Sequence, residues 1–86
     1  MTQNPEPSEI ADWLAGHLAT LLNVPSQDMD PQLPLDALGI TSMEEVILTA
    51  DLEQRYGISL PIPDMRRHPT IEGLSRYIHD RLPHPA

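Results

Sequence analysis

The sequence predicts a small all-α protein. Apolar residues recur at helical spacing in three segments, and prolines interrupt the stretches that join them. The one stretch that alternates like a strand contains Pro61 and Pro63, which exclude a paired central strand. With 86 residues the chain forms one domain. Such a domain buries about 60 to 65 per cent of the surface of its unfolded chain, so a broad catalytic cleft is not expected. Because the chain has no cysteine, apolar packing must hold the core.

The first helix is expected to be capped by Ser8 and to end before Pro25. Its apolar residues fall on one face: Ile10, Leu14, Leu18, Leu21 and Leu22. About 18 residues, three of them proline, then lead to the second helix. Their apolar residues recur closely enough to predict an ordered traverse with one short turn rather than a structureless loop. These apolar residues are Val24, Met29, Leu33, Leu35, Leu38 and Ile40.

The second helix is predicted from Ser42 to Tyr56, with Gly57 at its C-terminal cap. Its apolar residues occupy two opposite faces. One face is expected to join the core and consists of Leu48, Leu52 and Tyr56. The other is expected to be an exposed strip beside Ser42, flanked by acidic residues: Met43, Val46, Ile47 and Ala50, with Glu44 and Asp51. The alternative is a central helix covered on both sides, but we favour a face that docks partner proteins.

The remainder of the chain predicts an extended link and a last helix. The segment from Ile58 to His68 is expected to contain at most a short helix around Asp64 to Arg67. The last helix opens at Pro69–Thr70 and ends before Pro83. Its inward residues are Ile71, Leu74, Ile78 and Leu82.

The net charge of −8 is unevenly distributed. Residues 1–54 carry ten acidic residues and no lysine or arginine, and all five arginines follow. This acidity disfavours nucleic acid and anionic membranes as partners and favours basic protein surfaces, although solubility alone also explains an acidic total. The chain shows neither a secretory signal nor an apolar stretch of about 20 residues, so a soluble cytoplasmic protein is expected.

The stretch LGITSMEE, residues 38–45, contains two overlapping capping boxes. Either Thr41 with Glu44 or Ser42 with Glu45 can cap the second helix. If Thr41 caps, the Ser42 hydroxyl is free beside unpaired backbone N–H groups at the positive end of the helix, where an anionic group is favoured. If Ser42 caps, its role is structural.

The blocks LGITSM, DLEQRYGISLP and HPTIEGL resemble those of the acyl carrier proteins and carrier domains of fatty-acid and polyketide synthesis, over residues 9 to 82. The resemblance implies a four-helix bundle with a long first loop and a short third helix. It also implies that Ser42 carries 4′-phosphopantetheine, added from coenzyme A by a phosphopantetheinyl transferase. The protein would then be a monomeric carrier rather than an enzyme. It would shuttle acyl thioesters between acyl-loading and acyl-processing enzymes of polyketide or related secondary metabolism.

The same resemblance places the partner-binding residues on the second helix, where acidic carriers meet basic docking surfaces. They are Thr41, Met43, Glu44, Val46, Ile47, Ala50 and Asp51. The chain departs from the family at Thr41, usually Asp, and at Met43, usually Leu. Arg66 and Arg67 stand near a turn where the family often has Phe. These arginines could bind a dedicated partner or screen the charge of the acidic second helix, and we favour the second role.

Two other functions stay open. A peptidyl or aryl carrier of nonribosomal synthesis usually has Gly-Gly before the serine, whereas this chain has Gly39-Ile40. An unmodified interaction module would use Ser42 only as a cap. The four histidines, His17, His68, His79 and His84, show no metal-ligand spacing, and Ser42 lies in no nucleophile motif.

The expected organisation is a flexible segment 1–8, a carrier domain 9–82 and a tail 83–86. Met1 and the short tail favour a free-standing protein.

Overall fold

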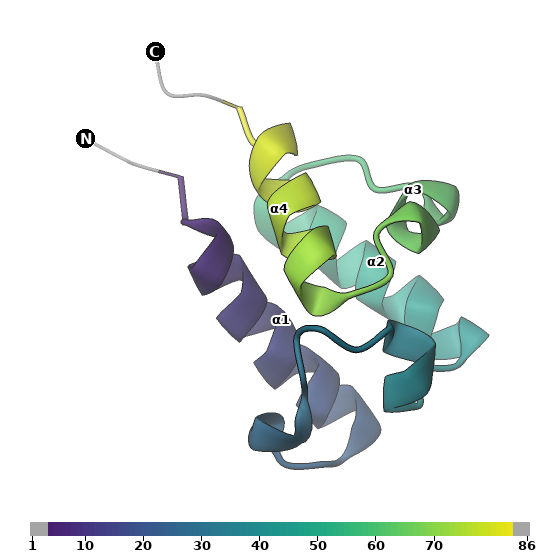
Figure 1. The fold of residues 1–86 in the computed structure, drawn as a ribbon. Coiled ribbons are helices and arrows are strands. Elements are labelled where there is room, and N and C mark those ends of the chain that lie inside the picture. Colours follow the sequence, from purple (N-terminus) through teal and green to yellow (C-terminus); the bar gives the residue numbers. More distant parts are fainter. Residues whose placement is uncertain (1–3, 84–86) are drawn as a thin grey trace.

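The computed structural model describes residues 4–83, which fold into a bundle of α-helices joined by ordered loops (Figure 1). The α-helices are α1 (Pro7–Leu22), α2 (Ser42–Tyr56), α3 (Ile62–Arg67) and α4 (Ile71–Arg81), and two 3-10 helices are η1 (Ser26–Asp28) and η2 (Leu35–Leu38). Strand-like pairing within this range is limited to one isolated bridge between Pro34 and Thr70. The predicted all-α bundle with a long ordered first loop and a short third helix is confirmed.

Helix α1 begins earlier than predicted, and its cap is not Ser8. Glu6 is the extended residue before the helix, and Pro7 is the first helical residue. Proline suits that position because its fixed φ matches the helix and its missing N–H is not needed there. Ser8 therefore lies exposed inside the first turn, and its prediction as the cap is wrong. The division into residues 1–8, 9–82 and 83–86 stays a prediction, because residues 1–3 and 84–86 lie outside the described part.

The long first loop is held by backbone hydrogen bonds as well as by apolar side chains. Met29 and Leu35 are buried, and Leu38 and Ile40 pack against the core. The Leu35 N–H donates to the Pro69 carbonyl at 2.7 Å, which joins η2 to the start of α4. The loop forms two 3-10 turns rather than the single turn predicted.

Val24 and Leu33 do not help to pin this loop. Their side chains are 38% and 42% exposed, so the prediction that they hold the loop across the helices is wrong. The Glu72 N–H instead donates to the Pro31 carbonyl at 3.1 Å, and this bond fixes the loop near Leu33. Backbone hydrogen bonds of this kind leave no hydrophobic pattern in a sequence.

The core is formed by one face of each long helix. Leu48 and Leu52 of α2 are fully buried, and Tyr56 is partly buried and packs against the core. Figure 1 shows α1 and α4 lying side by side, with α2 behind them. The predicted inward residues of α4 are all buried: Ile71, Leu74, Ile78 and Leu82.

Helix α3 is tied to α4 by a polar contact. It starts at Ile62, two residues earlier than predicted, because Pro63 fits within the first helical turn. Its Met65 side chain is buried in the core. The Tyr77 hydroxyl of α4 donates to the Asp64 carboxylate of α3 at 3.0 Å. Partial burial of the phenol, and then this hydrogen bond, raise the pKa of Tyr77 above its ordinary value of 10.0.

The Tyr77 contact predicts a loss of stability at alkaline pH. Since the pKa of Tyr77 is higher in the folded state than in the unfolded state, its stabilising contribution is present below pH 10.0 and is lost as the pH rises through the raised pKa. The chain has no lysine to titrate in the same range. We expect urea midpoints of the wild type to fall towards those of Tyr77→Phe as the pH is raised above about 10. A difference in urea midpoint between the two proteins that stays constant as the pH rises would contradict this role of Tyr77.

Candidate functional site

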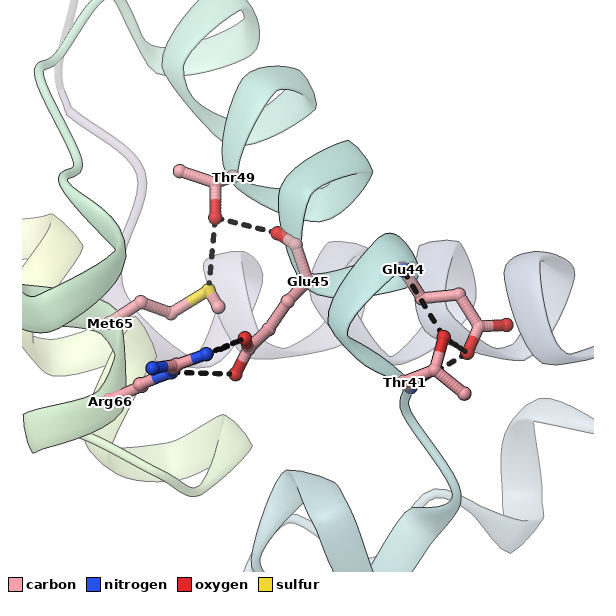
Figure 2. A network of polar contacts seen from close by, with 6 residues as sticks. All are labelled: Thr41, Glu44, Glu45, Thr49, Met65 and Arg66. Atoms are coloured by element: carbon pink, nitrogen blue, oxygen red, sulfur yellow. Dashed lines mark hydrogen bonds and ion pairs between the residues drawn. The ribbon is translucent and has the colours of Figure 1, made fainter.

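Thr41, and not Ser42, caps helix α2. The Thr41 backbone is extended, and the Glu44 N–H donates to its Oγ1 at 3.4 Å. The Glu44 carboxylate in turn accepts a hydrogen bond from the Thr41 N–H at 2.8 Å (Figure 2). This capping box is complete without Ser42. Of the two overlapping boxes in the sequence, the structure therefore forms the first.

Ser42 is the first residue of α2, and it is exposed to solvent. Its hydroxyl takes no part in the capping box and forms no hydrogen bond within residues 4–83. Gly39 makes the preceding turn possible: its φ of 97° lies in the left-handed region, which favours glycine. This turn ends η2 and brings the chain to an outer corner of the bundle, where Ser42 faces the solvent.

A pocket of about 340 Å³ lies beside Ser42, between η2, α2 and α3. Leu35, Ile40 and Met65 give it apolar walls. Its polar rim is made by Asp36 of η2, Glu45 of α2 and Arg66 of α3, together with Thr41 and Ser42. The serine hydroxyl therefore stands at the edge of a hollow that combines apolar walls with charged groups.

Helix α3 is joined to α2 at this pocket by an ion pair and a buried hydrogen bond. The Arg66 Nη2 donates to Glu45 Oε1 at 2.9 Å, and the Thr49 hydroxyl contacts the Met65 sulfur at 3.3 Å (Figure 2). The hydrogen bonds to Glu45, and then its charge, raise the pKa of Arg66 above the ordinary value, so the guanidinium stays charged. Arg66 thus screens an acidic residue of α2, whereas Arg67 pairs with Asp64 within its own helix.

The predicted apolar strip of α2 is exposed along its whole length. Met43 is 74% exposed, Val46 55% and Ile47 41%, and Ala50 is exposed as well. Leu48 and Leu52, on the opposite face, are fully buried. The described residues therefore do not cover both faces of α2, which removes the alternative of a central helix. That this strip docks partner proteins stays a prediction.

The two acidic residues predicted to flank the strip already have partners within the fold. Glu44 belongs to the capping box. Asp51 Oδ2 lies 2.6 Å from Nε2 of His17, which stacks on Trp13 at 4.6 Å between ring centroids. Sequence reasoning missed the His17–Asp51 contact and, although it favoured Arg66 as screening the acidic helix, did not identify Glu45 as its partner, because each pair joins helices that are far apart in the sequence. The only sequence signal was the unusual pair of arginines at Arg66 and Arg67.

Other classes of site gain no support from the described part of the chain. Residues 4–83 hold no group of three or more His, Asp or Glu side chains placed to bind a metal ion. His17, His68 and His79 are partly buried, and His84 lies outside the described residues. No helix within residues 4–83 is long and apolar enough to cross a membrane.

The described residues thus form a helical bundle with a buried apolar core and an exposed Ser42 hydroxyl at the start of α2. The sequence profile of the family described as "Phosphopantetheine attachment site" matches residues 12–78. The chain belongs to this family, and it is a carrier domain whose prosthetic group is phosphopantetheine.

Relatives by sequence include an acyl carrier protein and a subunit of a polyketide synthase. Acyl carrier protein TtuC of Teredinibacter turnerae is 30% identical over 81% of this chain and 80% of its own length. A phenolphthiocerol/phthiocerol polyketide synthase of Mycobacterium tuberculosis is 31% identical over 91% of this chain. The chain spans only 4% of the length of that synthase. This carrier domain is thus related to the acyl carrier domains of polyketide synthases.

Among solved structures, a free-standing peptidyl carrier protein from a secondary metabolic pathway of Acinetobacter baumannii superposes with a TM-score of 0.84. The match covers 90% of this chain and 96% of that protein, at 21% identity. This likeness confirms the carrier-protein fold and says nothing of the cargo.

The residues at the start of α2 fit the prosthetic group. A phosphopantetheine arm joined through a phosphodiester needs a hydroxyl that is accessible and not required by the fold, and the exposed Ser42 outside the capping box meets both conditions. The helix start favours the negative charge of the phosphate. The arm supplies the thiol that a chain without cysteine lacks.

Proposed function

We propose that Ser42 is the attachment residue and that the chain carries acyl groups as thioesters on its 4′-phosphopantetheine arm. The observation that carries the proposal is the exposed Ser42 hydroxyl, which the Thr41–Glu44 capping box leaves unused. The sequence relatives, at 30% and 31% identity, favour an acyl carrier of polyketide or related metabolism over a peptidyl or aryl carrier. We expect this function in the cytoplasm, where coenzyme A and a transferase that uses it would be available.

The attachment step needs little from the carrier itself. The Ser42 Oγ forms a bond to the phosphorus that bears pantetheine, and the bond from that phosphorus to the bridging oxygen of the pyrophosphate breaks. The hydroxyl proton passes to a base of the phosphopantetheinyl transferase, and adenosine 3′,5′-bisphosphate leaves. The carrier contributes the Ser42 hydroxyl as the nucleophile. This hydroxyl is available because Thr41 caps the helix in its place.

The test of the proposal is direct modification. The protein is incubated with coenzyme A and a broad-specificity phosphopantetheinyl transferase, weighed intact, and cleaved to locate the added group. We expect a gain of one phosphopantetheine, on the peptide that contains Ser42. A folded protein that gains none, beside a carrier that the same transferase modifies, would instead indicate an unmodified interaction module.

The proposal assigns the exposed strip of α2 to partner docking. Truncation of Met43 and Ile47 to alanine removes apolar contact area from this strip without opening the core. We expect kcat/KM of acyl loading by a partner enzyme to fall about tenfold, which corresponds to about 1.4 kcal/mol. The melting temperature should change only slightly compared with truncation of a buried residue, because both side chains are exposed.

A matched control lies outside the strip. Leu33 is 42% exposed, close to the 41% of Ile47, but it belongs to the first loop. Leu33→Ala should leave acyl loading at the wild-type rate. Equal rates for the strip variant and the wild type would remove the docking role.

A further inference from the structure

The pocket beside Ser42 has an electrostatic property that attachment of the arm makes important. Two carboxylates line it, Asp36 and Glu45, and Arg66 is the basic residue among its lining residues. A phosphodiester on Ser42 adds a further negative charge at this rim. The two carboxylates repel this charge and oppose the favourable effect of the helix start, so a cation at the same pocket would stabilise it. Arg66 of α3 is such a cation.

Glu45 holds Arg66 at the pocket that Ser42 also lines. Ser42 and Glu45 are three residues apart in α2, so their side chains leave the same face of the helix, about 5 to 6 Å apart at Cβ. The Arg66 guanidinium lies on the Glu45 carboxylate, with Nη2 at 2.9 Å and Nε at 3.3 Å from Oε1. Figure 2 shows this pair across the space between α2 and α3, a short way along α2 from the capping box.

The guanidinium keeps donors that the ion pair does not use. Its bonds to Glu45 come from Nε and Nη2, and Nη1 has no partner among residues 4–83. An arginine presents five N–H donors in a planar fork, so one edge can hold a carboxylate while another binds a phosphate oxygen. The Arg66 side chain is 61% exposed, so it is accessible to a ligand from solvent.

We propose that Arg66 binds the phosphodiester of the arm, with Nη1 donating to a non-bridging phosphate oxygen while Glu45 orients the guanidinium. The first atoms of the arm are then held over the pocket between α2 and α3 instead of pointing freely into solvent. This role rests on the proposed attachment at Ser42. Glu45 and Arg66 form a surface ion pair in the unmodified chain. After modification, the same pair would hold the phosphate of the arm.

The test compares the melting temperature before and after modification in the wild type, Arg66→Gln and Arg67→Gln. We expect modification to raise the melting temperature of the wild type by about 2 to 4 °C, the size typical of an exposed charge pair in a domain of this length. The rise should vanish in Arg66→Gln and persist in Arg67→Gln. Arg67 is the matched control, since it is an adjacent, exposed arginine that pairs with Asp64 and does not line the pocket.

A second measurement tests directly whether Arg66 contacts the phosphate. In the modified wild type, the phosphorus-31 resonance should differ from that of modified Arg66→Gln and match that of modified Arg67→Gln. Intact mass separates the two proposals: a chain that gains no phosphopantetheine overturns both. A chain that is modified but shows the same rise and the same phosphorus resonance in Arg66→Gln as in the wild type overturns the role of Arg66 alone.

Discussion

Replacing Ser42 with alanine should abolish phosphopantetheine attachment and leave the fold intact. The side chain is exposed and the helix cap is provided by Thr41 and Glu44, so the substitution removes the nucleophile without removing a structural contact. We expect no mass gain with coenzyme A and transferase under conditions that modify the wild type completely. The free energy of unfolding should stay within about 0.5 kcal/mol of the wild-type value.

The neighbouring residue is the control for this prediction. Thr41→Ala removes the capping hydroxyl, which costs about 1 kcal/mol of stability and lowers the melting temperature by about 4 to 8 °C in a domain of this size. It should still be modified, because Ser42 remains. Attachment to Ser42→Ala at any other residue would refute the assignment. So would a large loss of stability in Ser42→Ala with none in Thr41→Ala.

Truncating Leu48 to alanine should have the largest effect on stability. The side chain is fully buried between α2 and the rest of the core, and deleting buried methyl groups leaves a cavity. Such changes cost about 2 to 5 kcal/mol. The free energy of unfolding of an 86-residue chain is typically about 4 to 13 kcal/mol. The loss should therefore appear as a greatly reduced urea midpoint.

A substitution at the residue next to Leu48 shows whether the loss of stability comes from burial or from helix propensity. Ile47→Ala makes a similar truncation at a side chain that is 41% exposed on the opposite face. We expect it to change the free energy of unfolding by less than about 1 kcal/mol, because Ile47 is partly exposed and its truncation opens no cavity in the core, whereas Leu48 is fully buried. Similar losses for the two variants would mean that the strip is covered in solution, and the docking surface would have to be sought elsewhere.

The limits of α2 and the separation of its two faces could be predicted because their causes are local. Capping residues, the left-handed Gly57 and the spacing of apolar residues act within a few positions of one another. The residues Ser42 and Met43 were therefore placed correctly at an exposed helix start and on an exposed strip. The same local rules failed at Ser8, where a proline already fixed the helix start one residue earlier.

The first loop was only partly predictable. Met29 and Leu35 are buried as expected, but Val24 and Leu33 are exposed. Apolar spacing indicates that a segment can pack, whereas the packing of this loop also depends on carbonyl groups of Pro31 and Pro69 that accept hydrogen bonds from distant residues. Any residue type provides such carbonyls, so they carry no sequence signal.

The sequence by itself determined the limits of the second helix, that Ser42 opens it, and which of its two apolar faces joins the core. Tertiary structure decided how the first loop packs, and it brought Arg66 onto Glu45 and His17 onto Asp51. These pairs are 21 and 34 residues apart in the chain. Local rules reach only a few residues, so contacts between helices are fixed by how the finished bundle packs.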